Sequence, residues 1–182
     1  MSTFFISDLH FGHRNVLAFD NRPFNTIEEH DEALVQRWNE RVTAKDEVWV
    51  LGDISWYDPR KTAELLQRLN GTKRLCIGNH DAQLLTQKCV REQFAEITDY
   101  KELKLGDKMV ILCHYPIPCF KNHYYGWYHL YGHVHNTFEW NITERTKREM
   151  IELYDKECRM YNVGCMMSYM DYTPRTLGEI TQ

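Results

Sequence analysis

Four short apolar runs, each followed within two positions by a polar residue, constrain the fold of this chain more than any other feature of its sequence. The runs are residues 3–7, 47–51, 74–77 and 109–113, and the polar residues that follow them are Asp8, Asp53, Asn79 and His114. Each run has the length and the β-branched or aromatic content of a strand. The sequence therefore predicts strands that each deliver a polar side chain to a loop.

Helical patterns fill the intervals between the first runs. One set of apolar residues falls on one side of a 3.6-residue spiral: Ile27, Leu34, Val35, Trp38 and Val42. A second helix is expected to begin after Asp58, with Pro59 at its first position, and to end near Gly71. Alternating strands and helices predict right-handed crossovers, and such sheets bind ligands beyond the carboxyl ends of their strands.

The second half of the chain is expected to be richer in strands, with runs at 109–113, 130–134 and 159–163. Residues 143–156 are expected to form a charged helix or a long excursion between the last two runs. No internal repeat, low-complexity tract or linker divides the sequence, so residues 1–182 are expected to form one domain.

The composition is that of an ordinary globular protein, with 43% hydrophobic and 26% charged residues and a formal net charge of -4. This charge gives no sign of a nucleic-acid or membrane surface, so a nucleic-acid substrate would need a local basic patch. The start of the chain lacks the pattern of a signal peptide, and no apolar stretch could span a bilayer, which predicts a cytoplasmic protein. The six cysteines form no C-x-x-C pair and are expected to be free thiols.

The polar residues at the strand ends form an ordered series of potential metal ligands. Asp8-Leu9-His10 and His133-Val134-His135 each place two potential ligands two positions apart, which sends both to one side of an extended chain. The full set is Asp8, His10, Asp53, Asn79, His114, His133 and His135. It contains oxygen and nitrogen donors but no sulfur, which favours Mn, Fe, Zn or a similar divalent ion over a thiolate zinc site or an all-oxygen calcium site.

Seven ligands are too many for one catalytic ion. Two ions about 3.5–4 Å apart that share one carboxylate can clamp the entering and leaving oxygens of an in-line phosphoryl displacement, with a bridging hydroxide as nucleophile. Each short motif is weak alone, because a single D-x-H or G-H-x-H is usually an ordinary loop end. The ordered series of five motifs in one small domain carries the prediction.

The order and identity of these residues, from Asp8 to His135, resemble the calcineurin-like metallophosphoesterase superfamily. The resemblance implies an α/β (α+β) fold, a β-sandwich of two mixed sheets flanked by helices. It also implies two divalent ions, with Mn expected and Fe, Zn or Ni as alternatives. The ligands would divide into a first set, a second set and a bridge: Asp8, His10 and His135; Asn79, His114 and His133; and Asp53.

His80 follows a ligand in Gly78-Asn79-His80-Asp81, and the resemblance makes it the residue that protonates the leaving oxygen. An imidazole suits this role because it titrates near neutrality. Asp81 is expected to orient His80, and the alternative is that His80 caps a helix. Protein phosphatases of the superfamily carry an acid three residues after the bridging Asp, where this chain has Trp56. The departure favours a small-molecule or nucleotide phosphoesterase.

His13, Arg14 and Asn15 extend the first motif and are expected to bind the substrate phosphate, since imidazole, guanidinium and amide groups all recognise phosphate. This segment resembles a small bacterial and phage group of the superfamily that begins with a similar D-x-H-F-G-H-x-N stretch. The alternatives are that Arg14 pairs with a surface acid and that Asn15 caps the residues after it.

Residues 115–131 are unusually rich in aromatic side chains. They could stack a nucleobase over the metal site, close the core between strands, or form a contact between subunits. The sequence thus predicts a metal-dependent phosphoesterase, and more specifically a phosphodiesterase that acts on a nucleotide-like or small phosphoester. A phosphomonoesterase, a nuclease and a non-catalytic scaffold are the alternatives, and the retention of every ligand together with His80 favours an enzyme.

Overall fold

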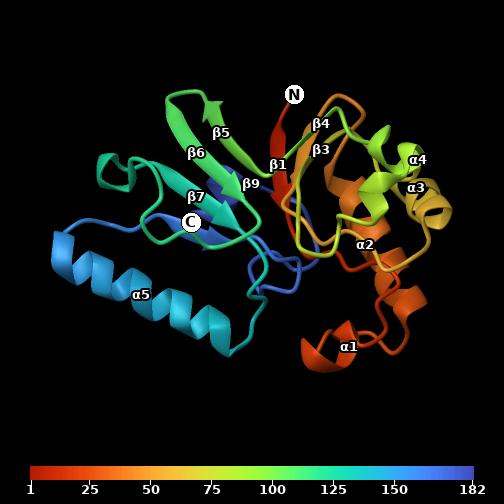
Figure 1. Cartoon of the computed structure of the whole chain (residues 1–182), viewed down its shortest axis with the longest axis horizontal. Coiled ribbons are helices and arrows are strands. Elements are labelled where there is room, and N and C mark those ends of the chain that lie inside the picture. Colours follow the sequence, from red (N-terminus) through yellow and green to blue (C-terminus); the bar gives the residue numbers. More distant parts are fainter.

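Two mixed β-sheets form the centre of the computed structural model, which describes all residues 1–182 (Figure 1). The first sheet has the strand order β4-β3-β2-β1-β9. Its strands are β1 (Thr3–Ile6), β2 (Glu47–Val50), β3 (Thr72–Cys76), β4 (Glu96–Thr98) and β9 (Arg175–Thr176). The first four run parallel to one another, and β9 lies antiparallel to β1. Their carboxyl ends therefore meet at one edge of the sheet.

The second sheet has the order β5-β6-β7-β8. Its strands are β5 (Tyr100–Leu105), β6 (Lys108–Cys113), β7 (Tyr128–Tyr131) and β8 (Met160–Asn162). Strands β5 and β6 form an antiparallel hairpin, whereas β6, β7 and β8 are parallel. The main hydrophobic core contains buried side chains of both sheets, including Phe5, Val50, Val110 and Leu130. The two sheets thus form a sandwich.

Helices flank both sheets (Figure 1). They are α1 (Val16–Phe19), α2 (Ile27–Arg41), α3 (Pro59–Gln67), α4 (Lys88–Arg91), α5 (Phe138–Tyr154) and α6 (Leu177–Ile180), with short 3-10 turns η1 (Leu84–Thr86) and η2 (His123–Tyr125). Helices α2, α3 and α4 lie beside the first sheet, whereas α5 lies along the second and packs Met150 into a small separate core. None of these helices combines the length and the apolar character needed to cross a membrane.

Local sequence signals explain the two helices that cover the first sheet. The Thr26 side chain caps α2 by accepting a hydrogen bond from the amide of Glu29, and the helix buries Leu34 and Trp38 against the core. Asp58 caps α3 by accepting from two amides of its first turn, and Pro59 occupies the first helical position. Both helices were predicted and are present, but α3 ends at Gln67, earlier than the predicted stop at Asn70-Gly71.

The predicted fold class is confirmed, but several elements differ from the expected ones. Strands β4, β5 and β9 were not predicted, because β5 alternates charged with partly buried residues and β9 has only two residues. The expected strand at 130–134 is wrong in its bounds: β7 ends at Tyr131, and the backbone then turns through positive φ at His133 and His135. The helix expected at 143–156 begins earlier, after the Thr137 cap.

Trp38 should be a main determinant of stability, because its indole is 1% exposed and its ring nitrogen donates to the carbonyl of Asn70. Replacing it by Ala should lower the free energy of unfolding by about 3–5 kcal/mol, measured by urea denaturation. Gln36→Ala, on the exposed side of the same helix, is the matched control and should change stability by less than about 0.5 kcal/mol. A loss below about 1 kcal/mol for Trp38→Ala would contradict this packing.

Candidate metal centre

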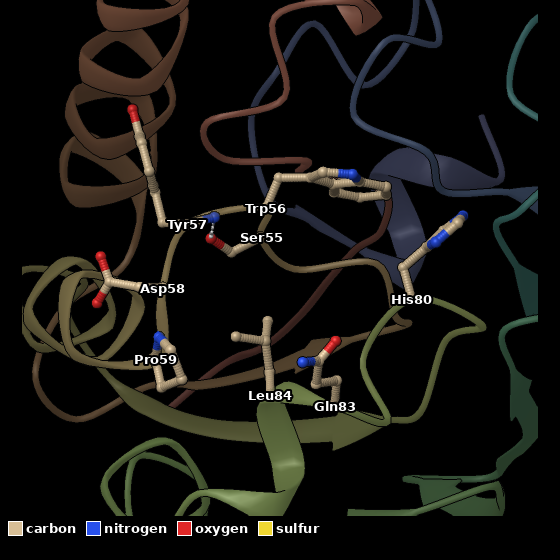
Figure 2. Close-up of a pocket in the computed structure, with 8 residues that line it drawn as sticks. All are labelled: Ser55, Trp56, Tyr57, Asp58, Pro59, His80, Gln83 and Leu84. Atoms are coloured by element: carbon tan, nitrogen blue, oxygen red, sulfur yellow. Dashed lines mark hydrogen bonds between the residues drawn. The ribbon is translucent and has the colours of Figure 1, made fainter.

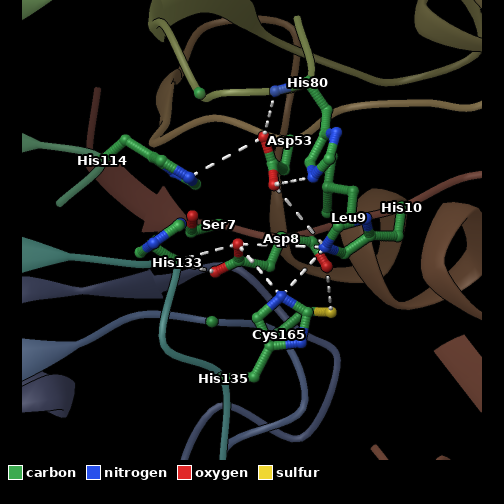
Figure 3. A network of polar contacts seen from close by, with 12 residues as sticks. Ser7, Asp8, Leu9, His10, Asp53, His80, His114, His133, His135 and Cys165 are labelled. Atoms are coloured by element: carbon green, nitrogen blue, oxygen red, sulfur yellow. Dashed lines mark hydrogen bonds and ion pairs between the residues drawn. The ribbon is translucent and has the colours of Figure 1, made fainter. Parts of the chain in front are cut away.

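The seven predicted ligands come together where the strands of both sheets end, and Figure 3 labels all of them except Asn79. They lie on the loops that follow β1, β2, β3, β6 and β7: Asp8, His10, Asp53, Asn79, His114, His133 and His135. Among their carboxylate and imidazole side chains, two overlapping triads have ligand atoms within 4.8 Å of one another and consist of buried residues only: Asp8 with His10 and His135, and Asp8 with Asp53 and His114. The fold thus gathers residues up to 127 positions apart in the sequence at one point.

The first group consists of Asp8, His10 and His135. The Nε2 atoms of the two histidines are 3.0 Å apart. Asp8 Oδ1 lies 3.6 Å from the Nε2 of His135 and 4.0 Å from that of His10. These three side chains therefore aim one oxygen and two nitrogens at a common point.

The second group forms around the amide oxygen of Asn79. This Oδ1 atom lies 2.9 Å from His114 Nε2 and 2.9 Å from His133 Nδ1. Asp53 stands between the two groups, with Oδ1 3.7 Å from His114 Nε2 and Oδ2 3.9 Å from His10 Nε2. One carboxylate thus presents one oxygen to each group, which is the position that a bridging ligand needs.

Hydrogen bonds on the far side of two imidazoles set which nitrogen faces the centre. His135 Nδ1 is 2.7 Å from Asp20 Oδ1, and His114 Nδ1 is 2.6 Å from the carbonyl oxygen of Leu51. When Nδ1 donates its proton to such an acceptor, Nε2 is left with a lone pair that can bind a cation. Both rings are therefore oriented as metal ligands are.

The electrostatics of the centre also favour a cation. Burial raises the pKa of Asp53 to about 6, and the nearby carboxylates of Asp8 and Asp81 add to the rise. Burial acts against the charged form of His135, but its hydrogen bonds to Asp20 and Asp8 outweigh this and raise its pKa to about 10. Both shifts come in part from the carboxylates gathered at the centre, and the same negative charge would attract a cation.

The donor set fits divalent metal ions on chemical grounds. Imidazole nitrogens, carboxylates and one amide oxygen suit ions such as Mn, Fe or Zn, and no thiolate faces the centre. The buried Nδ1 of His10 has no hydrogen-bond partner, although its Nε2 points at the first group. The residues present therefore fit two divalent ions, one for each group.

The backbone at the centre adopts a conformation that most residues avoid. Five of the seven ligands have positive φ angles between 47° and 71°: Asp8, His10, Asp53, His133 and His135. Such left-handed residues cost of order 1–3 kcal/mol each and cluster at functional sites. These turns occur directly after β1, β2 and β7 and orient the ligand side chains that follow these strands.

Close approach explains two motif glycines. A Cβ atom at Gly132 would overlap Ser7 Oγ and lie 2.5 Å from Asp8 Oδ2, and one at Gly78 would overlap Asp53 Oδ1. Only glycine lets these two loops pass so near the carboxylates. The glycines of G-H-x-H and G-N-H-D are therefore required by packing around the ligands.

The structure gives Asp81 a different position from the expected one. Its buried carboxylate accepts hydrogen bonds from the amides of Asp53, Ile54 and Gly78, at 3.0, 2.9 and 2.8 Å. With its oxygens engaged by backbone amides, Asp81 makes no hydrogen bond to the His80 side chain. Asp81 instead ties the loop of Asp53 to the loop of Asn79.

His80 lies beside the ligands without joining either group. Its side chain is 49% exposed, and its Nε2 lies 3.9 Å from Asp53 Oδ2. Its backbone amide donates to Asp53 Oδ1 at 3.0 Å, and its ring lies 4.5 Å from that of Trp56. The His80 ring is thus held at the open side of the centre.

A buried network behind the first group was not predicted. Arg22 is 4% exposed and donates to Asp20, to the carbonyl of Asp8 and to the carbonyl of Leu9. Asp20 in turn pairs with His135, a contact across 115 positions of sequence. No local sequence pattern predicts the pair of Asp20 and His135, because the two residues are far apart in the sequence.

The three residues expected to bind phosphate separate in the structure. His13 lines the cavity over the ligands, where its ring stacks on Trp56 with centroids 4.1 Å apart and an interplanar angle of 6°. The Arg14 side chain is 79% exposed, and its Nη2 lies 3.9 Å from Glu28 Oε1. The structure therefore shows Arg14 paired with a surface acid. Asn15 is the N-cap residue of α1, but its side chain makes no capping hydrogen bond.

The aromatic segment 115–131 divides in a similar way. Tyr115 alone packs on the ligands, with its ring 5.0 Å from His114 and 4.7 Å from His133. Phe120, Tyr128 and Tyr131 are buried, and Tyr124 packs against Tyr154 of α5. Part of this segment therefore closes the core, whereas Tyr115, Tyr124 and Tyr125 are exposed.

The comparisons with known proteins agree with this geometry. The model of the calcineurin-like phosphoesterase superfamily domain matches residues 1–180, and the chain therefore belongs to that superfamily. The predicted family is confirmed, together with a buried Asp/His centre of the kind that its members use for metal.

Relatives and a solved structure are also similar to this chain. An uncharacterized protein of Methanocaldococcus jannaschii is 34% identical over 134 residues, which cover 72% of this chain and 68% of that protein. The gene 66 protein of Mycobacterium phage L5 is 40% identical over 83 residues, which cover 44% of this chain and 40% of the phage protein. The crystal structure of AQ665 from Aquifex aeolicus, a protein of unknown function, matches this chain with a TM-score of 0.72 and 25% sequence identity. The match covers 98% of this chain and 97% of the AQ665 chain.

Asp20→Asn should weaken metal binding, because the amide is a poorer acceptor for the His135 ring proton. We expect a loss of about 10- to 100-fold in Mn²⁺ affinity, measured by calorimetric titration of the metal-free protein. Asp171→Asn is the matched control, since Asp171 also pairs with an arginine, Arg37, but lies on the surface. Equal affinities in the two variants would contradict the role of Asp20.

Proposed function

We propose that this chain is a phosphodiesterase that uses two divalent metal ions, with Mn²⁺ as the expected ion, and acts on a nucleotide-like or other small phosphodiester. The observation that carries the proposal is the position of Asp53, whose two oxygens face two separate ligand groups. When bound, such ions polarise phosphoryl oxygens and lower the pKa of water. Asp8, His10 and His135 would hold one ion, and Asn79, His114 and His133 the other.

The cavity over the ligands supports a diester rather than a monoester. It has a volume of about 460 Å³, and its lining includes Phe19, Trp56 and Glu139 but neither Arg nor Lys. Proteins commonly clamp phosphate dianions with arginine forks, and Arg14 is directed to Glu28 instead. A diester carries one negative charge and two organic substituents, which suits a cavity with aromatic walls and few cations.

In the proposed reaction His80 protonates the leaving oxygen. Its ring lines the same cavity, lies outside both ligand groups, and retains solvent access with half of its side chain exposed. Its backbone hydrogen bond to Asp53 fixes its distance from the bridging carboxylate. His80 would give its proton to the alkoxide as the bond to phosphorus breaks, and water would restore it.

A substrate panel with wild type and His80→Ala tests the proposal. With Mn²⁺ we expect hydrolysis of bis-p-nitrophenyl phosphate and of alkyl diesters, and weak or no hydrolysis of p-nitrophenyl phosphate. His80→Ala should lower kcat by about 10²–10⁴-fold for alkyl leaving groups and much less for p-nitrophenolate, which leaves without a proton. Metal content should stay unchanged.

The controls separate the alternatives. His123→Ala changes a histidine of η2, outside the cavity, and should retain wild-type kinetics. A monoester-only profile would overturn the diesterase assignment in favour of a phosphomonoesterase. Metal binding without hydrolysis of any ester would favour a scaffold, and loss of metal in His80→Ala would contradict its place outside the ligand groups.

A further inference from the structure

A second cavity adjoins the one over the metal ligands. It lies between residues 55–59 and residues 80–84 and has a volume of about 380 Å³ (Figure 2). Two side chains, Trp56 and His80, line both cavities. They therefore stand at the boundary between the two spaces, and we call this second space the 55–84 cavity.

The position of His80 determines what can enter the 55–84 cavity. If His80 protonates the leaving oxygen, as proposed above, the substituent on that oxygen must lie next to the His80 ring. The phosphate occupies the side of His80 that faces Asp53, where Nε2 and Oδ2 are 3.9 Å apart. The substituent can then continue past His80 into the 55–84 cavity, so this cavity is placed to hold the leaving group.

The walls of the 55–84 cavity indicate an uncharged, planar ligand. Trp56 provides an aromatic surface that is 38% exposed, and Pro59 and Leu84 add apolar surface. No Arg or Lys lines the cavity, and the carboxylate of Asp58 is engaged by the first amides of α3. A second phosphate would therefore find no counter-charge there.

Gln83 adds the capacity to recognise a hydrogen-bonding edge. Its side chain is exposed, lines the cavity and makes no hydrogen bond within the chain, so both its amide donor and its oxygen acceptor are free. The hydroxyl of Ser55, which also lines the cavity, is already engaged: it donates a hydrogen bond to the carbonyl of Phe11 and accepts one from Thr62. An aromatic surface beside a free carboxamide is a combination that suits a nucleobase.

We infer that the 55–84 cavity binds the leaving nucleoside of a phosphodiester substrate, with Trp56 against the base and Gln83 at its hydrogen-bonding edge. This inference rests on the proposed function. Hydrolysis breaks the bond from phosphorus to the leaving oxygen and forms one to the oxygen of water. Water loses one proton, and His80 supplies one to the leaving oxygen, which releases a neutral nucleoside and a phosphomonoester. The cavity volume lies near the lower end of the range of about 300–1,000 Å³ for small-ligand sites.

The kinetic test compares two diesters of the same nucleoside 3′-phosphate. One carries a second nucleoside as the leaving group, and the other carries methanol. We expect the wild type to favour the dinucleoside monophosphate by about tenfold or more in kcat/KM. Gln83→Ala should reduce this ratio by about three- to tenfold, the effect of losing one or two neutral hydrogen bonds. Gln87→Ala, an exposed glutamine outside the cavity, should leave the ratio unchanged.

A binding test separates this inference from the proposed function. Adenosine titrated into the metal-free protein should shift the NMR signals of the Trp56 indole and the Gln83 carboxamide. Hydrolysis of both diesters with an unchanged ratio in Gln83→Ala would overturn the nucleoside site and leave the phosphodiesterase standing. Adenosine binding at these residues without hydrolysis of either diester would overturn the proposed function and support the nucleoside site. Adenosine shifts confined to Phe19 and Val134 would place the base in the other cavity and contradict the inference.

Discussion

The carboxylate of Asp8 makes the contact on which the relative position of the two sheets and of the ligands depends. Asp8 ends β1 of the first sheet, and its oxygens accept hydrogen bonds at 3.2 and 3.1 Å from the amide of His133, which follows β7 of the second. The same carboxylate faces His10 and His135. One side chain therefore joins the two sheets and contributes to the first ligand group. A change that moves one sheet against the other must also change the distances between the ligands.

The buried polar groups of the centre need hydrogen-bond partners to offset the cost of removing them from water. Burial of an unpaired charge is costly, and left-handed backbone at five ligands adds to that cost. The chain offsets it with a buried set of fixed partners, in which Arg22 binds two carbonyls of the Asp8 loop and Asp81 binds three amides of the other loops. These contacts fix the backbone of the loops that carry the ligands.

The sequence predicted the fold class and all seven residues of the centre, because strand ends, glycines and ligand types recur there in a short-range order. It did not predict Asp20, whose partner His135 lies 115 positions away, or Arg22, which holds the Asp20 side chain and the backbone of the Asp8 loop. It misplaced Arg14 and Asp81, since the direction of a loop side chain depends on tertiary neighbours: Glu28 in one case and three backbone amides in the other. Strand β5 escaped prediction because its charged residues alternate as edge strands often do.

The position of Asp53 between the two ligand groups implies that it bridges two metal ions, which anomalous diffraction from crystals soaked in Mn²⁺ can test. We expect two peaks per chain, about 3.5–4 Å apart. One should lie among Asp8, His10 and His135 and the other among Asn79, His114 and His133, with Asp53 in contact with both. A single peak, or two peaks of which Asp53 touches only one, would contradict this bridging role.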